Sequence, residues 1–378
     1  MSDNRISVLI VDDSALMRNI ISRLIEKDNS LRVAGTAMNG RFGLNKIPRL
    51  NPDIIVLDLE MPEMNGIEFL KALRKEYDIP VVILSSIAKK GAKITMEALS
   101  LGASDFITKP GGSSTDDIDR VGSHLVSVLK AYGKDYRRKK GKIEAPLEDI
   151  DTQPGETEQI RRTKITAPAA AASRSERLWE KMTPRTEPEK PEIIAIGIST
   201  GGPNALRKVF AEINPDLATP IVVVQHMPAG FTKEFAASLD RVCPLEVKEA
   251  AEGDIIKPGR ILIAPGDAHI TIEKKSLASI IRLHDSDLVN GHKPSVGVLF
   301  DSVAENYGNK SLAVIMTGMG KDGAREIGKI YKEGGMTVAQ DSSSCIVFGM
   351  PRVAIEHDYI RQIVPLSEMA STISSLGS

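Results

Sequence analysis

The strongest constraint on the fold is a repeated alternation of short apolar runs and amphipathic stretches in the first third of the chain. The apolar runs have the length of buried strands and are Ile6 to Val11, Leu31 to Ala37, Asp53 to Leu57, Pro80 to Leu84 and Asp105 to Ile107. Apolar residues at helical spacing follow each run, the last of them from Thr115 to Tyr136. Five strand–helix repeats predict a doubly wound parallel sheet, (βα)5.

A segment of different composition, residues 137–190, separates this alternation from a second one. It is rich in Glu, Pro, Thr, Ala and Arg, and its few apolar side chains cannot offset the entropy lost on ordering. We therefore expect a flexible linker between a first domain, residues 1–136, and a second, residues 191–378. The single tryptophan, Trp179, either docks on a domain through a short helix, Ser175 to Met182, or stays in solvent.

The second alternation predicts another α/β domain with a mainly parallel sheet. Its apolar runs of buried-strand type are Ile193 to Ile198, Ile221 to Val224, Arg260 to Ala264 and Leu312 to Met316. A β-hairpin is predicted from Ile270 to Ile272 and Ile280 to Leu283, with Lys274, Lys275 and Ser276 at its turn.

Composition excludes several classes of function. Lys and Arg total 49 against 50 Asp and Glu, so no net basic field favours nucleic acid or an anionic membrane. The two cysteines form no metal or disulfide pattern, which fits a reducing compartment. Without an apolar run of membrane-spanning length or a signal-peptide pattern, the chain is expected to be cytoplasmic, with no nucleic-acid partner and no membrane insertion.

Acidic residues follow two strands of the first domain. Asp12 and Asp13 close the first strand and Asp58 closes the third, so these carboxylates are expected at one edge of the sheet, where Mg²⁺ binds well. Ser85 and Lys109 end the fourth and fifth strands and add a hydroxyl and an ammonium. A carboxylate in this setting can act as the nucleophile toward a phosphodonor. The alternative is that the acids serve only as helix caps or solubilising loop residues.

Five motifs in this domain resemble the receiver domain of two-component response regulators: VLIVDD at 8–13, LDLEMP at 57–62, MNG at 64–66, VILSS at 82–86 and GASDFITKP at 102–110. The resemblance implies that Asp58 accepts the phosphoryl group. It further implies that Asp13, Asp58 and the Glu60 carbonyl hold Mg²⁺ with help from Asp12. Ser85 and Lys109 would sense the phosphoryl group, and Phe106 would be the aromatic switch.

Three strand ends of the second domain carry the residue types of a serine-hydrolase triad. Ser199 follows the first strand within Gly-Ile-Ser-Thr-Gly, which fits the nucleophile-elbow spacing, and His226 and Asp322 follow two other strands. A glycine-rich phosphate-binding or structural turn is the alternative for the serine. His269, also near a strand end, is the rival base. The Met319 backbone N–H and an N–H beside Ser199 are candidate oxyanion donors.

Further motifs look like the catalytic domain of the chemotaxis methylesterase (CheB) family: IGISTGG at 196–202, VQHMP at 224–228, GFT at 230–232, APGDAH at 264–269, KPSV at 293–296 and TGMGKDG at 317–323. The resemblance implies a triad of Ser199, His226 and Asp322, with Thr200, Met319 and His269 around it. Two departures are Ile198, where a smaller residue is usual, and the long linker.

By the same resemblance the substrates are methyl-accepting chemoreceptors, and the reaction releases glutamate and methanol from glutamate γ-methyl esters, with deamidation of receptor glutamines as a further activity. The esterase reaction would need no cofactor. A chemotaxis histidine kinase would supply the phosphoryl group, and phosphorylation of Asp58 would move the first domain off the edge that bears Ser199.

Three other functions are alternatives to this one. An α/β-hydrolase esterase also uses G-x-S-x-G, but its chain order is Ser, acid, His, whereas this chain runs Ser199, His226, Asp322. The second domain could instead be a non-catalytic binding module gated by phosphorylation. A DNA-binding regulator is disfavoured because nothing after the linker resembles a basic helix-turn-helix.

Overall fold

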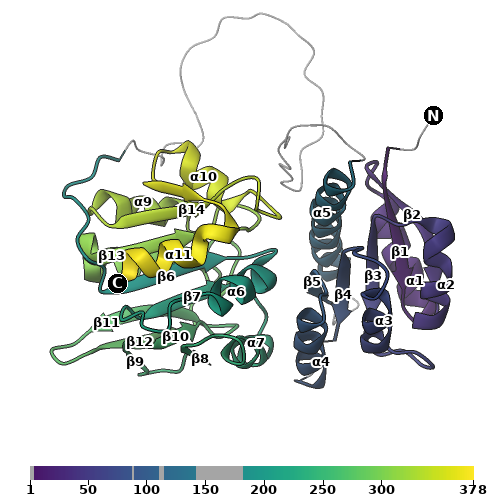
Figure 1. Ribbon diagram of the computed structural model, residues 1–378, viewed down its shortest axis with the longest axis horizontal. Coiled ribbons are helices and arrows are strands. Elements are labelled where there is room, and N and C mark those ends of the chain that lie inside the picture. Colours follow the sequence, from purple (N-terminus) through teal and green to yellow (C-terminus); the bar gives the residue numbers. More distant parts are fainter. Residues whose placement is uncertain (1–3, 87–88, 110–114, 142–181) are drawn as a thin grey trace, which may run out of the picture.

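A computed structural model describes residues 4–86, 89–109, 115–141 and 182–378, which form two α/β units (Figure 1). Trp179, nearly all of the helix predicted around it, and most of the predicted linker lie outside the described residues.

The first unit is a five-stranded parallel sheet with strand order β2-β1-β3-β4-β5. Its strands are β1 (Ile6–Val11), β2 (Leu31–Ala37), β3 (Ile54–Asp58), β4 (Val81–Ser85) and β5 (Asp105–Thr108). Its helices are α1 (Ala15–Glu26), α2 (Gly40–Leu50), α3 (Gly66–Leu73), α4 (Lys89–Ser100) and α5 (Thr115–Lys139). The predicted (βα)5 fold is confirmed.

Local signals explain why α3 begins where it does. The Asn65 side chain accepts the Glu68 N–H and the Glu68 carboxylate accepts the Asn65 N–H, which together form a capping box. At Gly66 an added Cβ would lie 2.5 Å from the carbonyl oxygen of Asp58, so only glycine lets the helix start this close to the end of β3.

The second unit has a seven-stranded parallel sheet of order β15-β14-β13-β6-β7-β10-β8 and a three-stranded antiparallel sheet of order β11-β12-β9. The seven strands are β6 (Ile193–Ile198), β7 (Ile221–Gln225), β8 (Glu246–Glu249), β10 (Arg260–Ile263), β13 (Ser311–Ile315), β14 (Met336–Gln340) and β15 (Gln362–Val364). The smaller sheet contains β9 (Ile255–Ile256), β11 (His269–Lys274) and β12 (Ser279–His284).

Helices cover the larger sheet of this unit: α6 (Gly202–Ala211), α7 (Phe231–Asp240), α8 (Val296–Tyr307), α9 (Ala324–Lys332), α10 (Met350–Glu356) and α11 (Leu366–Gly377), with a 3-10 turn at Gly308–Lys310. The predicted parallel sheet and the β11–β12 hairpin are confirmed. β6 lies in the middle of the sheet between β13 and β7, so the chain segments that follow these three strands meet at one edge.

The ends of the predicted linker differ from expectation. α5 continues past residue 136, because Arg137 is buried and donates to the Asn4 carbonyl at 2.6 Å instead of ending the helix in solvent. At the other end, Arg185 N–H donates to the Lys332 carbonyl at 2.8 Å and Glu189 N–H to the Asn309 carbonyl at 3.0 Å. Residues from 182 onward therefore lie along the second unit.

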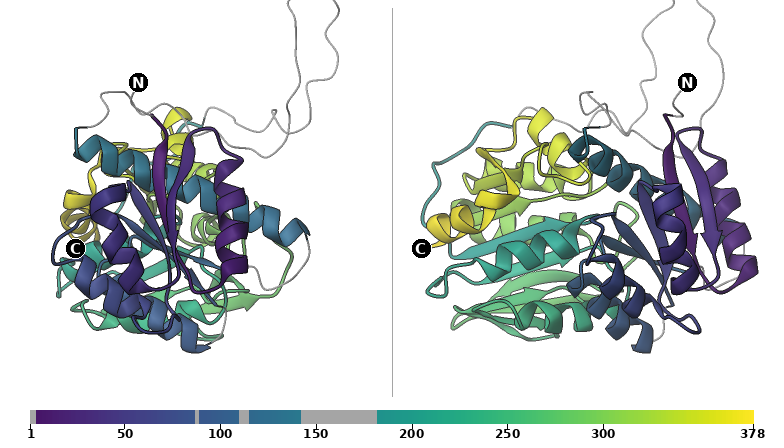
Figure 2. Two further views of the ribbon diagram at one scale, coloured as in Figure 1. Left: turned by 90° about the vertical axis from the view of Figure 1, so that its right-hand side faces the viewer. Right: turned by 45° about the vertical axis from the view of Figure 1, so that its right-hand side comes forward.

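The two units face each other through α4, β5 and α5 of the first and α6 and α7 of the second (Figures 1 and 2). Helices α4 and α7 are in direct contact. Among the helices in the described ranges, none combines the length and apolar character that crossing a membrane requires.

Candidate functional site

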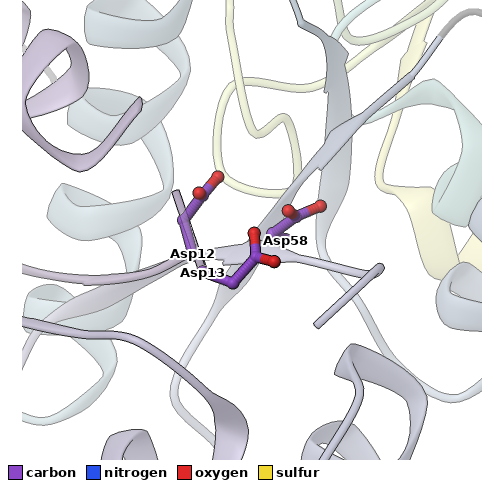
Figure 3. A group of neighbouring side chains, drawn as sticks. All are labelled: Asp12, Asp13 and Asp58. Atoms are coloured by element: carbon purple, nitrogen blue, oxygen red, sulfur yellow. The ribbon is translucent and has the colours of Figure 1, made fainter. Parts of the chain in front are cut away.

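The acidic residues predicted to converge do so at the carboxyl edge of the first sheet. Parallel pairing places Val11 opposite Leu57, so Asp12 and Asp13 follow β1 beside Asp58 at the end of β3. One carboxylate oxygen from each residue lies within 4.8 Å of the others, and Figure 3 shows these three side chains gathered at the sheet edge.

Lys109 reaches this cluster from the end of β5. Its Nζ lies 2.7 Å from Asp58 Oδ2 and 3.1 Å from Asp12 Oδ2. Burial alone would lower the pKa of the Lys109 ammonium. Asp58 and Asp12 have the larger and opposite effect, so the pKa of Lys109 is raised. Burial also raises the pKa of Asp58, although Lys109 acts in the opposite direction. The lysine thus balances part of the negative charge that three adjacent carboxylates create.

The same edge has room for a small oxygen-rich ligand. A pocket there is lined by Asp58, Glu60, Ser85 and Lys109 among others. The Ser85 hydroxyl accepts a hydrogen bond from Thr95 Oγ1 at 2.6 Å, and the Glu60 N–H points to Asp58 Oδ1 at 3.4 Å. Three carboxylates with a single lysine partner are a donor set that suits Mg²⁺, so the residues present fit this ion.

Phe106, on the same strand as Asp105, lies away from the acidic edge and against the second unit. Its ring stacks on Phe231 at the start of α7, with centroids 4.8 Å apart and planes at 16°. The predicted switch residue is therefore part of the contact between the units.

Ser199, His226 and Asp322 meet at the edge of the second sheet where β6, β7 and β13 end. The Ser199 Oγ lies 3.1 Å from His226 Nδ1, and His226 Nε2 lies 2.8 Å from Asp322 Oδ2. Ser199 and Asp322 are 8% and 1% exposed, so solvent barely competes for these hydrogen bonds. The structure brings together the three residues that sequence spacing selected.

Charge determines the direction of these hydrogen bonds. Burial raises the pKa of Asp322, but hydrogen bonds from His226, Asn290 and Ser295 outweigh it and bring the pKa to about 2. An ionised carboxylate only accepts, so His226 Nε2–H donates to it and the neutral ring is left with a lone pair on Nδ1. That lone pair faces the serine hydroxyl. The ring is reversed relative to the usual triad, in which Nε2 faces the serine.

The beginning of α8 holds the Asp322 carboxylate in place. Ser295 Oγ donates to Oδ1 at 2.7 Å, and the Val296 N–H donates to Oδ2 at 2.7 Å. Free N–H groups of a helix start stabilise a carboxylate without adding a positive side chain. Sequence analysis recognised the 293–296 motif but not this role.

Gln225, the last residue of β7, ties the serine and histidine loops together. Its Nε2 donates to the carbonyl oxygens of Ser199 and His226, each at 3.1 Å. An added Cβ at Gly202 would collide with the Gln225 side chain, so the second glycine of the serine loop makes room for this amide. Sequence analysis missed Gln225; the signal was a polar residue closing an otherwise apolar buried strand.

The other predicted residues lie around the group of Ser199, His226 and Asp322. His269 is fully buried; its Nε2 lies 3.0 Å from the Asp287 carbonyl and its Nδ1 accepts the Ser295 N–H, so it contacts Ser295 and not Ser199. The Thr200 carbonyl accepts from Thr317 Oγ1 at 3.0 Å. Met319 lies in the loop between β13 and Asp322. Oxyanion roles for Thr200 and Met319 stay predictions.

A second histidine, His292 in the loop after β12, lies against His226. The two rings stack with centroids 3.7 Å apart and planes at 9°.

The first unit contacts the loop that follows Ser199. Asp105 Oδ2 accepts the Gly201 N–H at 3.0 Å, and Asn204 Nδ2 donates to the carbonyls of Ala103 and Ser104 at 2.9 and 2.8 Å. Burial raises the pKa of Asp105 to about 6, even though the Gly201 and Phe106 N–H groups and the Tyr132 hydroxyl act against it. A buried carboxylate of one unit is thus bonded two residues from the serine of the other.

Comparison with known proteins agrees with this division. Residues 194–373 match the family described as CheB methylesterase, and residues 8–117 match the response regulator receiver domain. The chain is 56% identical to a protein-glutamate methylesterase/protein-glutamine glutaminase of Treponema denticola, over 98% of each chain. It is 49% identical to the protein of that name in Treponema pallidum, covering 99% of this chain and 98% of the relative. A third relative of this kind, from Koribacter versatilis, is 43% identical, over 99% of this chain and 96% of the relative.

Proposed function

Since the chain belongs to the CheB methylesterase family and carries a receiver domain, we propose that it is a phosphorylation-activated chemotaxis methylesterase. Its substrates are glutamate γ-methyl esters of methyl-accepting chemoreceptors, which it converts to glutamate and methanol in sensory adaptation. Deamidation of receptor glutamines is the second activity, because relatives of high identity are also named protein-glutamine glutaminases. The hydrogen-bonded line Ser199–His226–Asp322 carries the proposal.

In the proposed reaction, Ser199 Oγ attacks the ester carbonyl while His226 Nδ1 takes its proton. Asp322 stabilises the imidazolium that forms. His226 then gives the proton to the departing methoxide, which leaves as methanol, or to the side-chain amide nitrogen of a glutamine, which leaves as ammonia. Water activated by the same nitrogen cleaves the acyl-enzyme and restores the glutamate carboxylate. The N–H groups of Thr200 and Met319 are the proposed donors to the oxyanion.

The receiver domain is the proposed control element, with a histidine kinase as phosphodonor and Asp58 as acceptor. Asp12, Asp13, Asp58 and the Glu60 carbonyl would hold Mg²⁺, which when bound neutralises charge on the phosphoryl oxygens. Lys109 and Ser85 would then contact the phosphoryl group.

Strand β5 supports a mechanical link between the two sites. Lys109, directly after β5, binds Asp58, whereas Asp105 and Phe106 on β5 contact Gly201 and Phe231 of the catalytic unit. A phosphoryl group on Asp58 competes for Lys109 and changes the end of this strand. We propose that this weakens the contact near Ser199 and gives substrate access. The division into two domains joined by a linker and the cytoplasmic location belong to the same proposal.

The test is methanol release from a carboxyl-methylated chemoreceptor signalling fragment, with and without Mg²⁺ and a small-molecule phosphodonor. Wild type should release methanol faster with phosphodonor, Ser199→Ala should release none, and Asp58→Asn should keep only the basal rate. No release by folded wild type on a verified substrate would favour the binding-module alternative. Full turnover by Ser199→Ala would refute the proposed nucleophile.

A further inference from the structure

A tight hairpin at residues 289–292 lies beside the triad and is not explained by the roles proposed above. Val289 and His292 form an isolated antiparallel bridge, with N–H···O distances of 3.1 and 3.0 Å. The two residues between them, Asn290 and Gly291, have φ of 52° and 79°. Two successive positive φ values are those of a type I′ turn, for which Asn-Gly is the preferred pair. The turn therefore holds its side chains in defined directions.

His292 lies on one face of the catalytic imidazole. The two rings are 3.7 Å apart and within 9° of parallel. Hydrogen bonds at Nδ1 and Nε2 hold the His226 ring within its plane, but they leave it free to tilt about the line that joins Ser199 to Asp322. A ring packed on one face opposes that tilt.

The charge state of His292 is compatible with proton transfer to the His226 ring on which it packs. Burial, together with the nearby His226 and His124, lowers the pKa of His292 to about 4, although Asp322 acts in the opposite direction. His292 is therefore neutral at pH 7. When His226 takes the serine proton, a neutral aromatic face stabilises the new cation, whereas a second cation would repel it.

The same hairpin also touches the acid of the triad. Asn290 Nδ2 donates to Asp322 Oδ1 at 2.9 Å, on the oxygen that Ser295 Oγ also contacts. One short turn thus contacts two of the three triad residues.

We propose that the Val289–His292 hairpin is a positioning element, in which His292 sets the plane of the His226 ring and Asn290 fixes Asp322. The proposal rests on the proposed function, because it assigns His226 and Asp322 to proton transfer. It predicts that the shape of the His292 side chain matters and its nitrogen atoms do not.

The test compares His292→Ala, His292→Phe and Asn290→Ala in the full chain, activated with Mg²⁺ and phosphodonor. We expect His292→Ala to lower kcat by about tenfold to a hundredfold, with KM within about twofold. His292→Phe should restore most of the rate because it keeps an aromatic face. Asn290→Ala should also lower kcat without raising KM. His284→Ala, an exposed histidine of β12, is the control and should match wild type.

A second readout does not depend on turnover. The Nε2–H of His226, held by Asp322, should give a downfield proton NMR signal in wild type that is absent in His226→Gln. The signal should be lost or broadened in His292→Ala and kept in His292→Phe. An unchanged signal and kcat in His292→Ala, or a His292→Phe as slow as His292→Ala, would overturn the inference. Loss of methanol release in wild type, with the NMR pattern as expected, would instead refute only the proposed function.

Discussion

At the scale of single residues, the site depends on which atoms are free to accept a proton. Asp322 receives hydrogen bonds on both oxygens, from Ser295 and Asn290 on one and from His226 and Val296 on the other. It therefore stays ionised and determines the tautomer of His226. Sequence spacing could select these residue types, but not which ring nitrogen faces the serine.

Replacing Asp322 with Asn tests this directly. The Asn amide donates to His226 Nε2, which places the ring proton on Nδ1 and removes the acceptor that faces Ser199. We expect kcat to fall by about a thousandfold to ten-thousandfold. Methanol release with saturating phosphodonor measures the effect. The control is Glu305→Gln, an exposed carboxylate on α8, which should stay within about twofold of wild type; normal turnover in Asp322→Asn would contradict the assigned tautomer.

At the scale of elements, the sequence predicted the longest apolar runs but not every strand, since the buried strand β14 was not predicted. Ile6–Val11 and Ile193–Ile198 are observed with the predicted bounds, because both are continuous apolar runs that are buried along their whole length. The edge strands β8 and β15 were not predicted. β8 has the sequence Glu-Val-Lys-Glu, whose charged residues are typical of a sheet edge and carry no apolar run.

Gly318, in the loop after β13, has little room for a side chain. A Cβ added at Gly318 would lie 2.9 Å from Ser199 Cβ and would also collide with Met350 Sδ. In Gly318→Ala the serine loop must shift by a few tenths of an ångström, which misaligns Ser199 with His226. We expect kcat to fall by about tenfold to a hundredfold. The cost in folding free energy should be about 1–3 kcal/mol, measured by chemical denaturation. Wild-type kcat would mean that the loop has room for a methyl group.

At the scale of the whole molecule, the two units meet through β5 of the receiver and the loop that follows Ser199. Asn204, Gly201 and Phe231 of the catalytic unit contact residues 103–106 of the receiver. The resemblance placed the first domain over the edge that bears Ser199, but no motif predicted which residues would pair, because these contacts join residues about a hundred positions apart.

Removing one of these contacts should give substrate better access to Ser199 in the unphosphorylated chain. Asn204→Ala removes the side-chain donor to the Ala103 carbonyl and one of two donors to the Ser104 carbonyl, which keeps the Tyr132 hydroxyl. The expected cost to the closed state is about 1–3 kcal/mol. We expect unphosphorylated turnover to rise by about tenfold. Turnover with phosphodonor should stay at the wild-type level. Lys208→Ala, exposed on the same helix, is the control. An unchanged basal rate would show that this contact does not limit access.

The raised pKa of the buried Asp105 predicts how the free energy of unfolding depends on pH. Its pKa rises from 3.8 to about 6 in the folded chain, so between these values the folded state binds more protons than the unfolded state. The free energy of unfolding therefore falls as pH rises through this window. Relative to that of Asp105→Asn, the free energy of unfolding of wild type should fall by up to about 3 kcal/mol between about pH 4 and about pH 7. Urea denaturation at each pH measures the difference; a constant difference would contradict the raised pKa.

Residue types and their spacing were sufficient for the two α/β alternations and for the strand ends that carry Asp58, Ser199, His226 and Asp322. Such features are local, because the period of apolar residues determines strands and helices, and parallel strands end at a common edge. Only the tertiary structure decided that Gln225 and His292 pack against the triad and that Asp105 meets Gly201. These contacts depend on how separate elements pack, and close packing of the whole chain, not a short motif, selects each partner.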